Sequence, residues 1–140
     1  MRRARGVSPI HPTVGAASRF PTLLGSAGMD AFELADVAAE REAGGQPYLE
    51  FIAVPDLSVG LYVLAVGQPD LQQPHTEDEA YYVVSGRGQM TVGDDVRDVR
   101  PGSIIFVAAT VPHRFHDITE DLTILVVFGP AEGSRAVSSG

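Results

Sequence analysis

Cysteine is absent from this chain of 140 residues. Without it the protein has no disulfide framework, no thiolate metal site and no cysteine nucleophile. Nothing in the composition demands an oxidising compartment, and we expect a cytoplasmic location. Long apolar runs are absent too: none approaches the roughly 18 residues of a membrane-spanning helix, so we expect no membrane partner.

Positive charge is also scarce. The sequence has no lysine, and 10 arginines stand against 18 acidic residues, for a formal net charge of -8. Residues 1–29 hold four arginines and no acid, a charge of +4. The formal charge of residues 30–140 is therefore -8 minus +4, or -12. Recognition of nucleic acid begins with a basic patch, and this balance therefore argues against a nucleic-acid partner.

The length predicts one domain, since domains run to roughly 100–200 residues. Residues 1–28 are rich in Arg and free of acids, and Pro, Gly and Ser interrupt any apolar stretch that a secretory signal would need. We interpret residues 1–28 as a disordered leader, with a transit-peptide-like segment or a true start at Met29 as the alternatives. Residues 29–140 are then the single folded domain.

A short helix is predicted between Asp30, as its N-cap, and Gly44 and Gly45 at its end. After Pro47 the chain changes to short runs rich in Val, Ile, Tyr and Phe. These runs are YLEFIAV, SVGLYVLAV, EAYYVVS, GQMTVG, SIIFVA and DLTILVVF. SGRG and GDD offer glycines for hairpin turns, and the final GPAEGSRAVSSG is expected to fray. Many short strands without alternating helices indicate an all-β sandwich or barrel.

The stretch PHTEDEAYYVVSGRG, residues 74–88, places a histidine and three acids against a strand. His75 and Glu79 have the spacing of one helical face, but the YYVV that follows favours a strand. Four straight strand residues span about 13 Å, too far for both side chains to reach one ion, so the chain must curl. A small curved barrel supplies that bend. If Glu79 points inward, so do Tyr81 and Val83.

A second cluster, VPHRFHD, places His113 at the start of another strand, with Phe115 and Asp117 on its parity and His116 opposite. Two neutral imidazoles and one carboxylate form a facial ligand set that leaves positions open on a metal. Each imidazole then needs an acceptor for its other nitrogen, and Asp117 is a candidate for that role. We expect His116 to be a surface or packing residue.

Together the two clusters resemble the two motifs of the cupin superfamily. The first motif, G(X)5HXH(X)3–4E(X)6G, is matched by Gly67, Gln73, His75, Glu79 and Gly86. The second, G(X)5PXG(X)2H(X)3N, is matched in VAATVPHRFHD, where His113 takes the ligand position and Asp117 the last one. The departures are Gln73 for the leading His, Ala108 and Ala109 for Pro and Gly, and Asp117 for Asn.

The resemblance implies an all-β fold, the double-stranded β-helix or jelly-roll barrel, with its motifs within residues 67–117. It implies metal ligation by His75, Glu79 and His113, with Gln73 as a fourth ligand through its carbonyl oxygen. Glu77 shares the parity of Glu79 and is an alternative ligand, although a solvated turn is the simpler interpretation of it. The metal favoured is Fe(II), with Mn, Ni or Zn as alternatives.

The resemblance also implies a metal-dependent enzyme that acts on a small organic substrate inside the barrel. Non-haem Fe(II) dioxygenase chemistry is the first hypothesis, and a metal-dependent isomerase, lyase or cyclase is the second. A cupin that binds a ligand or metal without turnover is the third, and Gln73 favours it. Tyr81 is the candidate for proton transfer, and Phe115 and Val83 are candidates to line the substrate pocket. We expect a homodimer in which residues 47–54 pair across the interface.

Overall fold

The computed structural model describes residues 28–134. The expected leader lies, but for Gly28, outside the described residues. One helix and six strands follow in order: α1 (Leu34–Gly44), β1 (Tyr48–Val54), β2 (Leu57–Leu64), β3 (Asp78–Val92), β4 (Asp95–Val99), β5 (Ile104–Val107) and β6 (His113–Gly129). No helix within residues 28–134 is long and apolar enough to cross a membrane.

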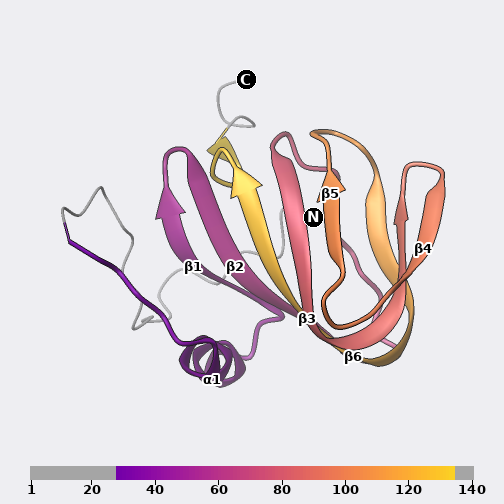
Figure 1. Ribbon diagram of the computed structural model, residues 1–140, viewed down its shortest axis with the longest axis horizontal. Helices are drawn as coiled ribbons and strands as arrows, with labels where there is room; N and C mark the ends of the chain where they lie inside the picture. Colours follow the sequence, from indigo (N-terminus) through magenta and orange to yellow (C-terminus); the bar gives the residue numbers. More distant parts are fainter. Residues whose placement is uncertain (1–27, 135–140) are drawn as a thin grey trace.

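The six strands form one antiparallel sheet in the order β1-β2-β6-β3-β4, with β5 paired to the other edge of the first part of β3. Figure 1 shows that the sheet is strongly curved, with β1 and β2 on the left, β4 on the right, and the bent strands β3 and β6 below and between them. The all-β prediction with one short helix is therefore confirmed. Two local expectations were wrong: SGRG lies inside β3 and makes no hairpin, and β4 was not expected at all because its charged sequence lacks an apolar run.

The long ribbon of β3 and β6 folds back on itself. Val92 pairs with His113, and Glu79 lies 13 residues earlier on the same strand, a span of about 44 Å if β3 were straight. Yet Glu79 Oε1 lies 3.1 Å from His113 Nε2. The ribbon bends where its register shifts, between Val83 and Gln89. The chain also bends at Thr76 and Glu77, just before β3, which is within the interval where the curl between His75 and Glu79 was predicted.

Gly86 stands at the middle of that bend. Its φ is +95°, and a Cβ built there would lie 2.1 Å from the carbonyl oxygen of Asp121 and 2.7 Å from Cα of Leu122. Both contacts are with the backbone of β6, so no side-chain rotation relieves them. A residue without a Cβ is therefore required at this position for the two strands to cross closely.

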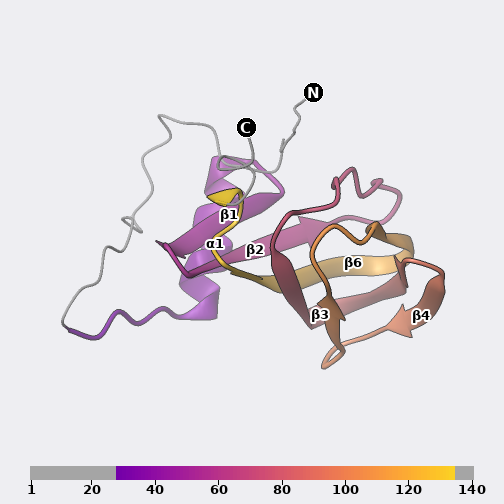
Figure 2. The same ribbon diagram turned by 90° about the horizontal axis from the view of Figure 1, so that it is seen from above.

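The inside of the rolled sheet is an apolar core built from alternate residues of its strands. Tyr81, Val83, Met90 and Phe115 are all at most 1% exposed and belong to it. A second, smaller cluster on the outside includes Val37 of α1 and Leu61 of β2. In Figure 2 the helix lies against β1 and β2, which is where this outer cluster is covered.

The helix begins later than expected. Glu33 is its N-cap and makes no side-chain cap hydrogen bond, so Asp30 is not the cap. The residues between them have no regular secondary structure. At the other end Gly45 has a φ of 75°, and its N–H donates to the carbonyls of Arg41 and Glu42, as the predicted glycine terminus requires.

Part of the outer face carries exposed apolar side chains. Ile104 and Phe106 of β5 are 72% and 64% exposed, and they pair in register with Tyr82 and Ala80 of β3. β1 lies at the other side, at the edge of the sheet order. Pairing of two copies through residues 47–54 remains a prediction.

Candidate metal centre

Three side chains from separate elements converge at one end of the barrel. His75 lies in the loop between β2 and β3, Glu79 is the second residue of β3 and His113 is the first residue of β6. One ligand atom from each lies within 4.8 Å of the others. Two backbone-anchored contacts hold the loops together: Thr110 N–H donates to the His75 carbonyl (2.6 Å), and Ala109 N–H donates to Asp78 Oδ1 (2.9 Å).

The tautomer of His113 follows from its surroundings. Its Nδ1 lies 2.8 Å from the Val111 carbonyl oxygen, which can only accept, so Nδ1 carries a proton. In a neutral ring Nε2 then presents a lone pair, and it faces Glu79 Oε1 at 3.1 Å without the alignment of a hydrogen bond. Two acceptors facing each other at this distance repel unless a cation or a proton lies between them.

Histidine pKa values at the site move in opposite directions. Burial alone would lower the pKa of His113, but the Glu79 carboxylate and the Val111 carbonyl outweigh it, and the pKa lies above its usual value. Burial lowers the pKa of His75, with partial compensation from Glu79. His75 therefore prefers the neutral form, in which an imidazole nitrogen can bind a metal.

The unsatisfied polar atoms fit a divalent ion. Nε2 of His75, Nε2 of His113 and both carboxylate oxygens of Glu79 are buried with no hydrogen-bond partner among the described residues. Leaving such atoms unpaired in a protein interior is costly. A set of two imidazoles and one carboxylate suits Fe, Mn, Ni or Zn. The residues present therefore fit the metal that the resemblance implies, and that they bind it remains a prediction.

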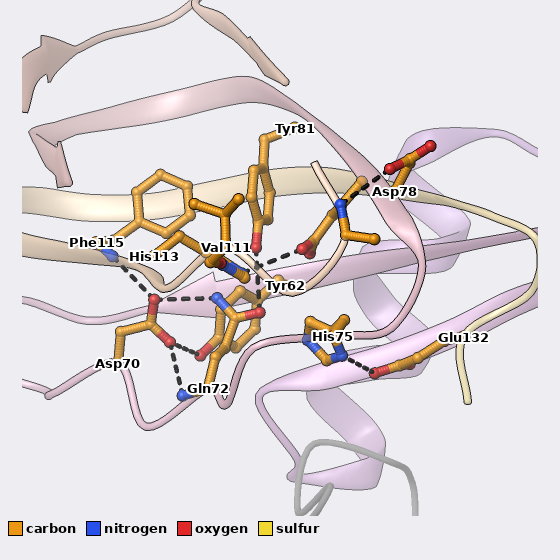
Figure 3. Close-up of polar contacts among 12 residues, drawn as sticks. Tyr62, Asp70, Gln72, His75, Asp78, Tyr81, Val111, His113, Phe115 and Glu132 are labelled. Atoms are coloured by element: carbon orange, nitrogen blue, oxygen red, sulfur yellow. Dashed lines mark hydrogen bonds and ion pairs between the residues drawn. The ribbon is translucent and has the colours of Figure 1, made fainter. Parts of the chain in front are cut away.

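Figure 3 shows what faces the outer side of His75. Its Nδ1 lies 3.6 Å from Oε2 of Glu132, a side chain 1% exposed. Burial, together with the charges of Glu50, Glu79 and Glu77, raises the pKa of Glu132 well above its usual value. Sequence reasoning missed Glu132, because it assigned the segment to a frayed end.

Gln73, the predicted fourth ligand, lies in the loop before His75. It is exposed, whereas its neighbour Gln72 is partly buried and turns inward. Gln72 donates through Nε2 to Asp70 (3.0 Å) and accepts from the Tyr81 hydroxyl at Oε1 (3.1 Å). The hydrogen bonds to Asp70 therefore turn Gln72 inward, and a ligand role for the exposed Gln73 remains a prediction.

Asp70 organises the loop between β2 and β3, as Figure 3 shows. One carboxylate oxygen accepts from the Tyr62 hydroxyl (2.8 Å) and the other from the Phe115 N–H (2.9 Å). The carboxylate therefore ties the loop to β2 and to β6. It was also missed, since its sequence, GQPDLQQP, has the composition of an ordinary turn.

Tyr81 is buried inside the barrel at 1% exposure. Burial is the main cause that raises its pKa well above the usual value, and the charges of Glu79 and Asp70 add to it. The phenol is therefore protonated at neutral pH and keeps an O–H that can donate a hydrogen bond. Phe115 and Val83 are core residues, at 1% and 0% exposure; that they line a substrate pocket remains a prediction.

Two other acids are placed differently from expectation. Glu77 is 2% exposed and accepts from Thr76 Oγ1, so it is not a solvated turn residue. Asp117 is not the acceptor for a ligand histidine: its φ of 49° turns it outward, and it contacts Nδ1 of His116 at 2.6 Å. His116 also contacts Thr91 Oγ1 (2.6 Å), which fits the packing role predicted for it.

The chain resembles known proteins in sequence and in fold. A family model described as cupin domain matches residues 60–128. An uncharacterized protein of Streptomyces coelicolor, SCO3923, is 50% identical over 104 residues, which cover 74% of this chain and 99% of that protein.

Solved structures share the barrel. An RmlC-like cupin from Shewanella frigidimarina matches with a TM-score of 0.55 and 19% identity over 60% of this chain and 75% of its own. A structure of the DMSP lyases RdDddP and RnDddQII matches with a TM-score of 0.54 and 25% identity, over 60% of this chain and 47% of its own. These similarities bear out the rolled all-β architecture.

Proposed function

This chain belongs to the cupin superfamily, and from that premise we propose that it is a metal-dependent enzyme acting on a small organic molecule at His75, Glu79 and His113. The observation that carries the proposal is the buried set of imidazole nitrogens and carboxylate oxygens that lack hydrogen-bond partners among residues 28–134. A bound divalent ion would supply Lewis-acid polarisation of a substrate oxygen.

Tyr81 supports proton transfer as the chemistry. Its hydroxyl holds a proton at neutral pH, Gln72 orients it from one side, and Glu79 acts on its pKa from the other. The hydroxyl donates its one proton to Gln72, and it would donate that proton instead to a strongly basic substrate atom that enters beside the ligand cluster. Only His75 of the three ligand side chains reaches solvent appreciably, at 9%, so entry is expected from its side. We therefore favour a lyase or isomerase.

Fe(II) dioxygenase chemistry is the second candidate. The observation that favours it is the ligand set itself, two histidines and one carboxylate, which is the set used by non-haem Fe(II) oxygenases. The two candidates share the metal site and differ in whether dioxygen is consumed.

Metal binding is tested first. The wild type and the variants H113A and E79Q are stripped with chelator, reloaded anaerobically with Fe(II), Mn(II), Ni(II) or Zn(II), and followed by elemental analysis and thermal unfolding. We expect one stoichiometric ion and a raised melting temperature in the wild type only. H116A is the matched control, because His116 lies outside the cluster. Absence of a retained ion in the wild type, or equal losses in H116A, would overturn the metal site.

The chemistry is tested on the loaded protein. A panel of small hydroxy-, oxo- and β-substituted carboxylic acids is incubated in D2O under argon and in air, with NMR detection of deuterium at carbon and an oxygen electrode. Oxygen-independent deuterium uptake or elimination that Y81F reduces supports the lyase or isomerase. Y62F is the control, since Tyr62 donates to Asp70 instead. Oxygen consumption in place of deuterium uptake supports the dioxygenase. Tight metal binding without turnover of any panel member contradicts the enzyme and favours a binding module.

A further inference from the structure

We propose that Glu132 is a positioning residue of the metal centre, which accepts a hydrogen bond from His75 Nδ1 and so keeps Nε2 directed at the ion. The inference rests on the proposed metal site. It assigns a role to a segment beyond β6 that no ligand motif includes.

The backbone around Glu132 is fixed by the hairpin of β1 and β2. Ala131 N–H donates to the Pro55 carbonyl (3.3 Å), and Glu132 N–H donates to Oγ of Ser58 (2.9 Å), a residue with 0% exposure. The carboxylate therefore starts from an anchored position rather than from a loose end. Its side chain is 1% exposed and reaches Nδ1 of His75 at 3.6 Å (Figure 3).

The two ligand histidines have different acceptors for their outer nitrogens. For His113 the acceptor is the Val111 carbonyl, at hydrogen-bond distance. For His75 it is the carboxylate of Glu132, and the 3.6 Å separation is longer than a hydrogen bond. Metal-binding histidines almost always donate their second N–H to a carboxylate or a carbonyl, which fixes the tautomer and raises the basicity of the ligand nitrogen. We infer that this contact closes when Nε2 of His75 binds the ion.

The orientation of the His75 ring supports this assignment. The ring packs edge-on against Phe128, with centroids 4.8 Å apart, and lies 5.9 Å from the ring of His113. Nε2 is buried and has no hydrogen-bond partner among the described residues, whereas Nδ1 faces Glu132. Only one of the two ring nitrogens is therefore available to the ligand cluster.

The test compares Zn(II) affinity, measured by competition with a chromophoric chelator, in the wild type, E132A and E132Q. Loss of an outer-shell partner typically lowers metal affinity about 10- to 100-fold, and we expect that loss in E132A. E132Q keeps an acceptor oxygen in the same position, so its loss should be smaller. E120Q is the control, since Glu120 pairs with Arg87 on the surface. Thermal unfolding of each variant in chelator confirms that it folds.

A second readout separates positioning from folding. In the 15N-labelled zinc form, NMR of the His75 ring should show Nδ1–H protected from exchange in the wild type, weakened in E132Q and lost in E132A, with the His113 signal unchanged. If the wild type binds no metal, the proposed function fails. If the wild type binds tightly and E132A retains both the affinity and the Nδ1–H signal, the role of Glu132 is refuted while the metal site stands.

Discussion

Replacing Gly86 with alanine should damage both the fold and the metal site. Residues that carry a Cβ pay roughly 1–2 kcal/mol to adopt a left-handed conformation, and the φ here is +95°. The new Cβ would also lie 2.1 Å from the Asp121 carbonyl oxygen, and forcing an atom into a filled space costs typically 1–3 kcal/mol. Together these predict a loss of about 2–5 kcal/mol in the free energy of unfolding.

Gly102 provides the matched control. Its φ is also +95°, but a Cβ built there meets nothing within 4 Å. G102A should therefore cost only the conformational part, about 1–2 kcal/mol. The difference between the two variants isolates the close crossing of β3 over β6.

Equilibrium unfolding in urea, followed by circular dichroism in the presence of chelator, measures both variants. A difference of 1 kcal/mol corresponds to roughly 4 °C in melting temperature for a domain of this size. Zn(II) affinity should fall in G86A and not in G102A, because the bend at Gly86 carries His113 back to Glu79. If G86A is as stable as G102A and binds metal equally well, the close crossing is refuted.

Four further predictions follow from the site and its surroundings. Burial raises the pKa of Glu50 from 4.5 to about 7, so the folded protein binds the Glu50 proton more tightly than the unfolded chain does. The contribution of Glu50 to the free energy of unfolding is therefore fully present below pH 4.5 and is lost as the pH rises through 7. The loss amounts to up to about 3 kcal/mol. E50Q should abolish that loss in urea titrations at pH 5 and 8, and an unchanged pH slope would contradict the assignment. The raised pKa of His113 means that protons compete with the metal, so Zn(II) affinity should weaken as pH falls through that pKa; a flat titration profile would count against ligation by His113. D70A leaves the Phe115 N–H and the Tyr62 hydroxyl without their acceptor and should cost about 2–5 kcal/mol in urea, more than Y62F alone. Sedimentation velocity should give a homodimer of twice 14.8 kDa, and a single species at 14.8 kDa would rule it out.

Strand parity explains why the ligand cluster could be predicted from the sequence. Once Glu79 is assigned to the inner face, Tyr81 and Val83 must follow it, and both are buried as expected. The resemblance to the two motifs assigned His75 and His113 to one metal site with Glu79, and the structure brings the three side chains together.

The alternation of side chains between two faces applies only within strands, and the side chains that the sequence did not place correctly lie in loops. Residues 65–77 form a loop without regular structure, so nothing in the order of Gln72 and Gln73 indicates which one turns inward. The hydrogen bonds from Gln72 to Asp70 decide it, and they exist only in the folded chain. Glu132 was missed for a related reason, because its anchor, Ser58, is 74 residues away in sequence.

The SGRG segment shows a different limit. Glycines beside a strand commonly mark a turn, and that rule predicted a hairpin at these residues. Here Gly86 marks a bend within a strand of 15 residues. Glycine is favoured both where a chain reverses in a hairpin and where a strand bends. Only the pairing of β3 with β6 shows that Gly86 lies in a bent strand.

The central position of β6 in the sheet also determines when the metal site can form during synthesis and folding of the chain. His113 begins that strand, and its last residues pair with β2 and with the start of β3. During synthesis, a nascent chain that has emerged only as far as β5 has His75 and Glu79 but neither His113 nor the strand that closes the barrel. Contacts over such long sequence separations form slowly. The ion should therefore be acquired after translation, by a barrel already closed, and its uptake would report that folding is complete.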